Sequence, residues 1–159
     1  MAKYILEEML RVRNFRKDVA EKNLKQAQRL VEEAKENVEN AKKTLDEFKI
    51  FIEKETERLY KKVMMQKVKK EAVDALHYAI KVLKSKLITH EQNLETAKDN
   101  LIKAEKNLEE KREALQEANK NVEKIKSHKE EWLKDATKEE ELIVDKELEE
   151  FAKKKEQEE

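Results

Sequence analysis

The side chains best suited to chemistry in this chain are three histidines, His77, His90 and His128. Imidazole binds metal ions and transfers protons, but either task needs a second group within a few ångströms. On straight helices these three residues lie too far apart to meet. In the segment HKEEW, His128 has no second neutral ligand at helical spacing, since Lys129 and Glu131 do not provide one. We therefore expect a solvated histidine there and no metal site.

Other catalytic patterns are missing from the 159 residues, which contain no Gly, Pro or Cys. Without cysteine there is no disulfide, thiol chemistry or cysteine-ligated metal. Without glycine there is no phosphate-binding loop and no serine-centred turn, and the chain has no HExxH segment. The sequence predicts a protein that is not an enzyme and binds no cofactor.

The elements that carry these residues are predicted from a repeat of seven. Apolar residues recur at this interval in two columns along each half of the chain, as in coiled coils. In the first half the columns are Ala20, Ala27, Ala34, Ala41 and Phe48, and Leu24, Val31, Val38, Leu45, Ile52 and Leu59. In the second half they are Val73, Ile80, Leu87, Leu94, Leu101, Leu108, Leu115 and Val122, and Leu76, Leu83, Ala97, Ala104, Ala118 and Ile125.

The two halves complement each other when they are folded antiparallel. If paired residue numbers add to 135, Ala27 faces Leu108 and Val38 faces Ala97, so that small meets large. This alternation fills the space between close helices and sets the register, although registers one heptad away, at 128 or 142, stay open. With 47% charged and 5% aromatic residues, the chain cannot build a thicker core. The predicted fold class is all-α: a long two-helix antiparallel coiled-coil hairpin with an overhanging C-terminal helix.

The hairpin is expected to be a single domain over residues 1–159. Arm one covers about 3–65, the bend about 66–70 and arm two about 71–155. At 1.5 Å per residue the paired arms run for about 90 Å, and residues beyond about 132 have no partner helix. The ends differ in charge, because residues 1–17 are basic whereas residues 139–159 hold ten acids against four lysines.

Five polar residues interrupt the apolar columns. Long side chains can extend from such positions to reach water. They are Arg13, Lys17, Glu55, His90 and Lys111. Trp132 also occupies a core column, where we expect it to close the hairpin over Tyr4 and Leu6.

Function is expected at apolar residues that lie off the columns, since exposed apolar clusters mark interaction sites. Between Leu24 and Leu45 the outward positions are almost wholly polar. Near the bend, Ile50, Tyr60 and Met64 point outward from arm one. Near the chain ends, Val19 extends a second stripe. The predicted protein-binding residues are Ile5, Arg11, Val12, Arg13, Phe15 and Arg16 at the base, and Ala75, Tyr78 and Val82 at the tip.

Charge and hydropathy limit the partners and the compartment. The chain has 37 basic and 37 acidic residues, which argues against nucleic acid. No apolar run reaches the length of a membrane span, and Glu7 and Glu8 lie where a signal peptide would be apolar. The sequence predicts a cytoplasmic protein with no membrane insertion.

Two segments resemble the YscO and FliJ family of type III secretion stalk proteins. The first is the opening pattern Tyr4, Leu6, Leu10, Arg13, Arg16, Ala20, Glu21 and Leu24. The second, His128 to Trp132 followed by Lys134 and Ala136, is similar to the chlamydial branch, CdsO. The resemblance implies a stalk that contacts a hexameric export ATPase and the cytoplasmic domain of the export gate. Some members also bind secretion chaperones. A stalk of this kind is expected to be monomeric.

The principal alternative is a structural coiled coil that self-associates as a spacer. A designed hairpin is disfavoured by the imperfect columns and by the off-column apolar clusters. Light scattering would distinguish the stalk from the spacer, because a spacer must self-associate and a stalk acts as one copy.

Overall fold

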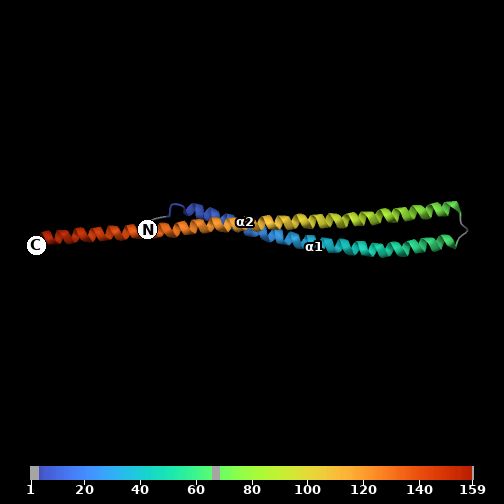
Figure 1. The fold of residues 1–159 in the computed structure, drawn as a ribbon, viewed down its shortest axis with the longest axis horizontal. Coiled ribbons are helices and arrows are strands. Elements are labelled where there is room, and N and C mark those ends of the chain that lie inside the picture. Colours follow the sequence, from blue (N-terminus) through green and yellow to red (C-terminus); the bar gives the residue numbers. More distant parts are fainter. Residues whose placement is uncertain (1–3, 66–68, 159) are drawn as a thin grey trace. The chain divides into compact units, whose positions relative to one another are not determined.

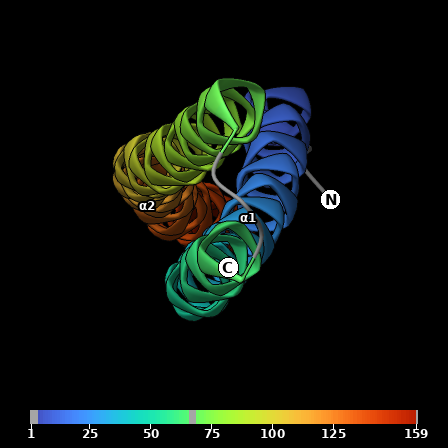
Figure 2. The same ribbon diagram turned by 90° about the vertical axis from the view of Figure 1, so that its right-hand side faces the viewer.

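The computed structural model describes residues 4–65 and 69–158, and nearly all of them are helical. Helix α1 spans Glu7–Met64 and helix α2 spans Lys70–Glu158. The view along the helices shows the two elements with no sheet or further layer over the described residues (Figure 2). The predicted all-α, two-helix fold is therefore confirmed.

Charged residues at the two ends of α1 are distributed as the helix dipole favours. Acidic residues Glu7 and Glu8 lie in the first turn of α1, and Lys61 and Lys62 lie in its last turn. This distribution complements the helix dipole. Arm one was expected to begin at about residue 3, but α1 begins at Glu7, after a turn in which the Glu7 amide donates to the Tyr4 carbonyl at 3.2 Å. Of the predicted bend at 66–70, residues 66–68 lie outside the described part, and α2 begins at Lys70.

The chain divides into two compact units. The base unit contains Met1–Leu24 and Lys111–Glu159, and the bend unit contains Lys25–Glu110. Each unit pairs a segment of α1 with a segment of α2, and Figure 1 shows the course of both helices in sequence colours.

Both units are antiparallel, and the base unit keeps the predicted register. In the base unit Arg13 contacts Asn121, and these numbers add to 134. In the bend unit the rings of Phe48 and His90, whose numbers add to 138, lie 4.6 Å apart. In the base unit the register centred on 135 is confirmed, because Tyr4–Trp132 and Glu7–Lys129 both add to 136. In the bend unit 138 lies between 135 and 142, so the register there stays a prediction.

The core is narrow and follows the heptad columns. Apart from Tyr4, its buried apolar residues are small or medium in size, because two helices alone enclose little space. They are Tyr4, Leu10, Ala27, Val31, Ala34, Val38, Leu45, Leu76, Val122 and Ile125. Among the described residues no polar or charged side chain is fully buried.

Each polar residue in a core column either makes a contact or stays partly exposed to water. Arg13 extends across the interface to the Asn121 carbonyl, and His90 packs against Phe48. Glu55 accepts two hydrogen bonds from Arg58, one of them from Nε at 3.1 Å. This bonding to Arg58 lowers the pKa of Glu55 and raises that of Arg58. Lys17 and Lys111 remain half-buried. Long side chains at seam positions thus keep their polar ends paired or hydrated.

Candidate protein-binding surfaces

A cluster around Tyr4 closes the base unit. Tyr4, Leu10, Val122 and Ile125 form a buried apolar group, and Leu6 and Trp132 pack against it. The rings of Tyr4 and Trp132 meet edge to face at 5.4 Å. This geometry is favourable for aromatic pairs and confirms that Trp132 closes the hairpin over Tyr4 and Leu6.

Two polar contacts fasten the same cluster. The Tyr4 hydroxyl hydrogen-bonds to Nδ1 of His128. From the sequence, the His128 side chain was expected to contact only solvent. The Lys129 ammonium lies 2.9 Å from the Glu7 carboxylate and 5.9 Å from the centre of the Tyr4 ring. These contacts join the first turn of α1 to α2, so the start of α1 is held in place and can present its outer face to a partner.

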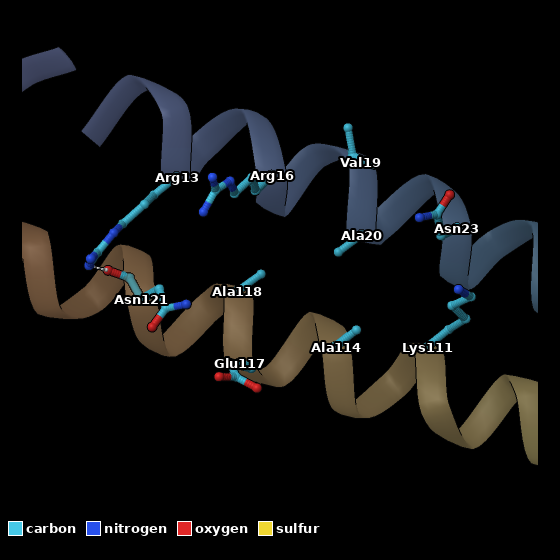
Figure 3. Close-up of a pocket in the computed structure, with 10 residues that line it drawn as sticks. All are labelled: Arg13, Arg16, Val19, Ala20, Asn23, Lys111, Ala114, Glu117, Ala118 and Asn121. Atoms are coloured by element: carbon cyan, nitrogen blue, oxygen red, sulfur yellow. Dashed lines mark hydrogen bonds between the residues drawn. The ribbon is translucent and has the colours of Figure 1, made fainter. Parts of the chain in front are cut away.

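A groove runs between α1 and α2 in the base unit (Figure 3). Small residues on both helices, Ala20, Ala114 and Ala118, leave space there. Arg16 points into this space and Lys111 extends from α2 toward Asn23. Arg13 crosses it, and its Nη1 donates to the Asn121 carbonyl at 3.0 Å. The groove therefore has an apolar floor and a basic wall.

The predicted apolar stripe of the base is exposed. Ile5 is 82% and Phe15 68% exposed, and Val12 and Val19 also contact solvent. Met9, which sequence analysis did not select, lies on the same face and lines a shallow groove with Val12 and Arg16. We define the base stripe as Ile5, Met9, Val12, Phe15 and Val19. Arg11 and Arg16 beside it are exposed, whereas Arg13 is half-buried.

The predicted tip residues differ in exposure. Tyr78 is 70% exposed and Ala75 is exposed, as expected for a docking surface. Val82 is half-buried, so its predicted outward position is wrong. The cause is geometric, because Val82 directly precedes the core-column residue Leu83 and lies on the flank of the interface rather than opposite to it. Ile50, Tyr60 and Met64 on α1 are exposed as predicted, as is Phe51.

Sequence analysis missed an apolar surface on the last part of α2. Every residue from 137 to 158 is exposed, including several large apolar ones. They are Leu142, Ile143, Val144, Leu148 and Phe151. The seven-residue interval between Val144 and Phe151 was a visible signal, but the high acidic content of the segment obscured it.

In residues 4–65 and 69–158, no group of three or more potential ligands could hold a metal ion. Neither helix, in its described residues, is long and apolar enough to cross a bilayer.

These features define a class: an all-helical protein of two long helices that carry exposed apolar surfaces. The sequence model of the family "Type III secretion protein YscO" matches residues 6–154 of this chain. The chain therefore belongs to the YscO family of type III secretion proteins, an accessory family and not a known enzyme family.

A solved structure supports the chlamydial branch. The chain is similar to CT670 from Chlamydia trachomatis, described as a YscO homolog, with 31% identity and a TM-score of 0.77. The match covers 96% of this chain and 94% of CT670. Among curated proteins, no sequence match was found.

Proposed function

We propose that this chain is a non-enzymatic cytoplasmic stalk that links the export ATPase of a type III secretion system to its export gate. The observation that carries the proposal is the base stripe, an exposed apolar face with Arg11 and Arg16 beside it on the ordered start of α1. Apolar residues at intervals of three and four on one helix face are typical of helices that bind a protein groove. Membership of the YscO family supports a partner within the secretion apparatus.

In this proposal the base stripe binds the ATPase. A binding helix supplies apolar contact area, and neighbouring cations speed association with an acidic partner. The Tyr4 cluster supports this role because it fixes the first turn of α1 against α2. The chain would contribute no chemistry itself. It would favour particular conformations of the ATPase subunits by binding them unequally.

The tip surface is the proposed contact for the cytoplasmic domain of the export gate, with a secretion chaperone as a further partner. Tyr78 supports this assignment because it is a large aromatic residue that the core does not use. Tyrosine is enriched at the energetic centres of protein interfaces.

Binding of the purified chain to the cognate export ATPase tests the proposal. The best variant reverses Arg11 and Arg16 to glutamate and leaves Arg13 unchanged, since Arg13 has a structural contact with Asn121. We expect slower association and strong salt dependence, because these side chains are exposed. A matched control reverses Lys25 and Arg29, which are exposed elsewhere on α1. Equal binding by both variants, or no binding by the unmodified chain, would refute the ATPase assignment.

The spacer alternative has one observation in its favour. In the bend unit, Leu30 on α1 and Ile88 and Ile102 on α2 are exposed. Leu30 lies between Leu24 and Leu45, where the outward positions were expected to be almost wholly polar. A spacer would use such residues to associate side by side. If the chain is a spacer, replacing Leu30, Ile88 and Ile102 by glutamine should abolish its self-association. If it is a stalk, the same variant should still bind the ATPase.

A further inference from the structure

The final part of α2 carries an apolar stripe that has no partner within the described residues. We define the tail stripe as Leu133, Thr137, Val144, Leu148 and Phe151. Spacings of three, four and seven place these residues on one helix face. All are exposed, and Phe151 is 65% exposed. Thr137 is polar, and Glu140 and Glu141 lie on the same face before Val144, so the apolar part is concentrated in Val144, Leu148 and Phe151. A single helix with exposed apolar residues on one face is marginally stable alone and gains stability when that face is covered.

The tail stripe and the base stripe each contain one column with the same spacing and length. Ile5, Val12 and Val19 recur every seven residues in the base stripe, and Thr137, Val144 and Phe151 recur every seven residues in the tail stripe. Each column covers 15 residues. The tail column spans about 21 Å of α2 at 1.5 Å per residue, whereas in the base column Val12 and Val19 lie in α1 and Ile5 lies in the turn before it. Two stripes of this kind can pack against each other as a short coiled coil.

The two stripes carry opposite charge. Residues 8–17 contain four basic residues, Arg11, Arg13, Arg16 and Lys17, against Glu8 alone. Residues 139–150 contain seven acidic residues against Lys146 alone. Complementary charge of this size favours a contact between the two segments and opposes contact of either segment with itself.

Charge also selects the orientation. In an antiparallel contact whose paired residue numbers add to 156, Val12 lies opposite Val144 and the ends of the columns coincide. The flanking residues then form opposite-charge pairs, with Glu7 and Glu149 as an exception. The favourable pairs are Arg11 with Asp145, Arg16 with Glu140, Lys17 with Glu139 and Asp18 with Lys138. A parallel contact of the same columns is less favourable, because it forms only two opposite-charge pairs, Arg13 with Asp145 and Lys17 with Glu149. Its three like-charge pairs are Glu7 with Glu139, Glu8 with Glu140 and Asp18 with Glu150.

The two stripes of one chain cannot meet. From Trp132 to Glu158 the helix α2 continues without interruption, so the tail leads away from the base of its own unit. The chain contains no proline or glycine that would let the helix fold back. The tail stripe therefore needs a second molecule.

We propose that the tail stripe of one copy binds the base stripe of a second copy in the antiparallel register that pairs Val12 with Val144. Each copy offers one base and one tail, so the contact is heterologous and joins copies head to tail. It is short and rimmed by exposed ion pairs, so it is weak and reversible and leaves single copies at low concentration.

This inference stands independently of the proposed ATPase contact. If both hold, they compete, because the tail of a second copy covers the base stripe. Self-association would then protect the stripe until the ATPase replaces the second copy.

Sedimentation equilibrium of the purified full chain tests the proposal, over concentrations from about 1 µM to about 1 mM, the range expected for a weak helix contact. The average mass of the unmodified chain should rise with concentration. Either R11E/R16E or E140R/D145R should weaken association at least tenfold, because two ion pairs become two repulsive pairs. The quadruple variant, which restores opposite charges, should recover association. Circular dichroism should show the same helicity for all variants.

Two controls keep the result specific. Reversal of Lys25 and Arg29 to glutamate should leave association unchanged, since these residues lie outside the contact. Substitution of Val144 and Phe151 by serine should weaken association without altering charge. A chain that stays monomeric throughout the range overturns the proposal. Association that the charge variants leave intact, or that the quadruple variant fails to recover, overturns it as well.

Discussion

The hydroxyl oxygen of Tyr4 lies 2.5 Å from Nδ1 of His128, a residue 124 positions later in the chain. This hydrogen bond joins the turn before α1 to the exposed side of α2 at the level where the paired helices end. It lies beside the Tyr4–Trp132 ring contact, so one tyrosine combines a polar and an apolar link across the hairpin.

The first prediction concerns this link. Tyr4→Phe removes the hydrogen bond and keeps the ring, and we expect a loss of about 1 kcal/mol in the free energy of unfolding, typical for one partly buried hydrogen bond. Tyr4→Ala also removes the buried ring and should cost about 3 kcal/mol. Urea unfolding measures both. Equal stability of Tyr4→Phe and the unmodified chain would mean that the His128 contact contributes nothing.

The second prediction tests the register through Ala27 and Leu108. Ala27 is 1% exposed, so Ala27→Leu overpacks the interface and should cost about 1–3 kcal/mol. Leu108→Ala leaves a cavity and should cost about 2 kcal/mol. If the register centred on 135 places the two residues opposite each other, the double variant should be more stable than the sum of both losses, with a coupling of about 1 kcal/mol or more. Strict additivity would show that they are not partners.

The third prediction concerns the pH dependence contributed by Glu55. Its pKa in the folded protein is lowered by hydrogen bonding to Arg58 from an ordinary value of 4.5. A lowered folded-state pKa means that the ionised form is favoured by folding, so the stabilisation is present above 4.5 and is lost as pH falls through the lowered value. The melting temperature of Glu55→Gln should therefore be slightly below that of the unmodified chain at pH 7.

The difference should be small, because the pair is exposed, and it should vanish in acid. Thermal melts of both proteins between about pH 2 and pH 7 measure it, a range that spans the ordinary carboxyl pKa. A difference that grows as the pH falls would contradict the assigned direction.

The fourth prediction separates binding from folding at the tip. Tyr78→Ser should change the free energy of unfolding by under about 0.5 kcal/mol, because the side chain is exposed. Val82→Ser should cost more, since Val82 is half-buried. If the tip binds the export gate, Tyr78→Ser should reduce that binding in a titration with the purified cytoplasmic domain. Unimpaired binding by Tyr78→Ser would remove the tip from the proposed interface.

Much of the fold could be predicted because the signal is local and periodic. The seven-residue columns define the helices, and alternation of small and large residues such as Ala27 and Leu108 selects the antiparallel register. Absence of glycine, proline and cysteine excludes most other architectures before any packing is considered. The exposed base stripe follows from the same periodicity, because residues off the columns of a two-helix bundle have nothing to cover them.

The tertiary structure determined side-chain contacts and burial that the heptad periodicity does not indicate. The bonds from Tyr4 to His128 and from Arg13 to the Asn121 carbonyl depend on side-chain rotamers and on how far each helix extends, so sequence spacing did not indicate them. Val82 was assigned outward because it lies off the columns, but it is half-buried on the flank of the interface. The sequence already predicted that residues beyond about 132 have no partner helix, and the structure showed that every residue from 137 to 158 is exposed. A heptad fixes which face a residue occupies, whereas the position of the neighbouring helix fixes whether that face is covered.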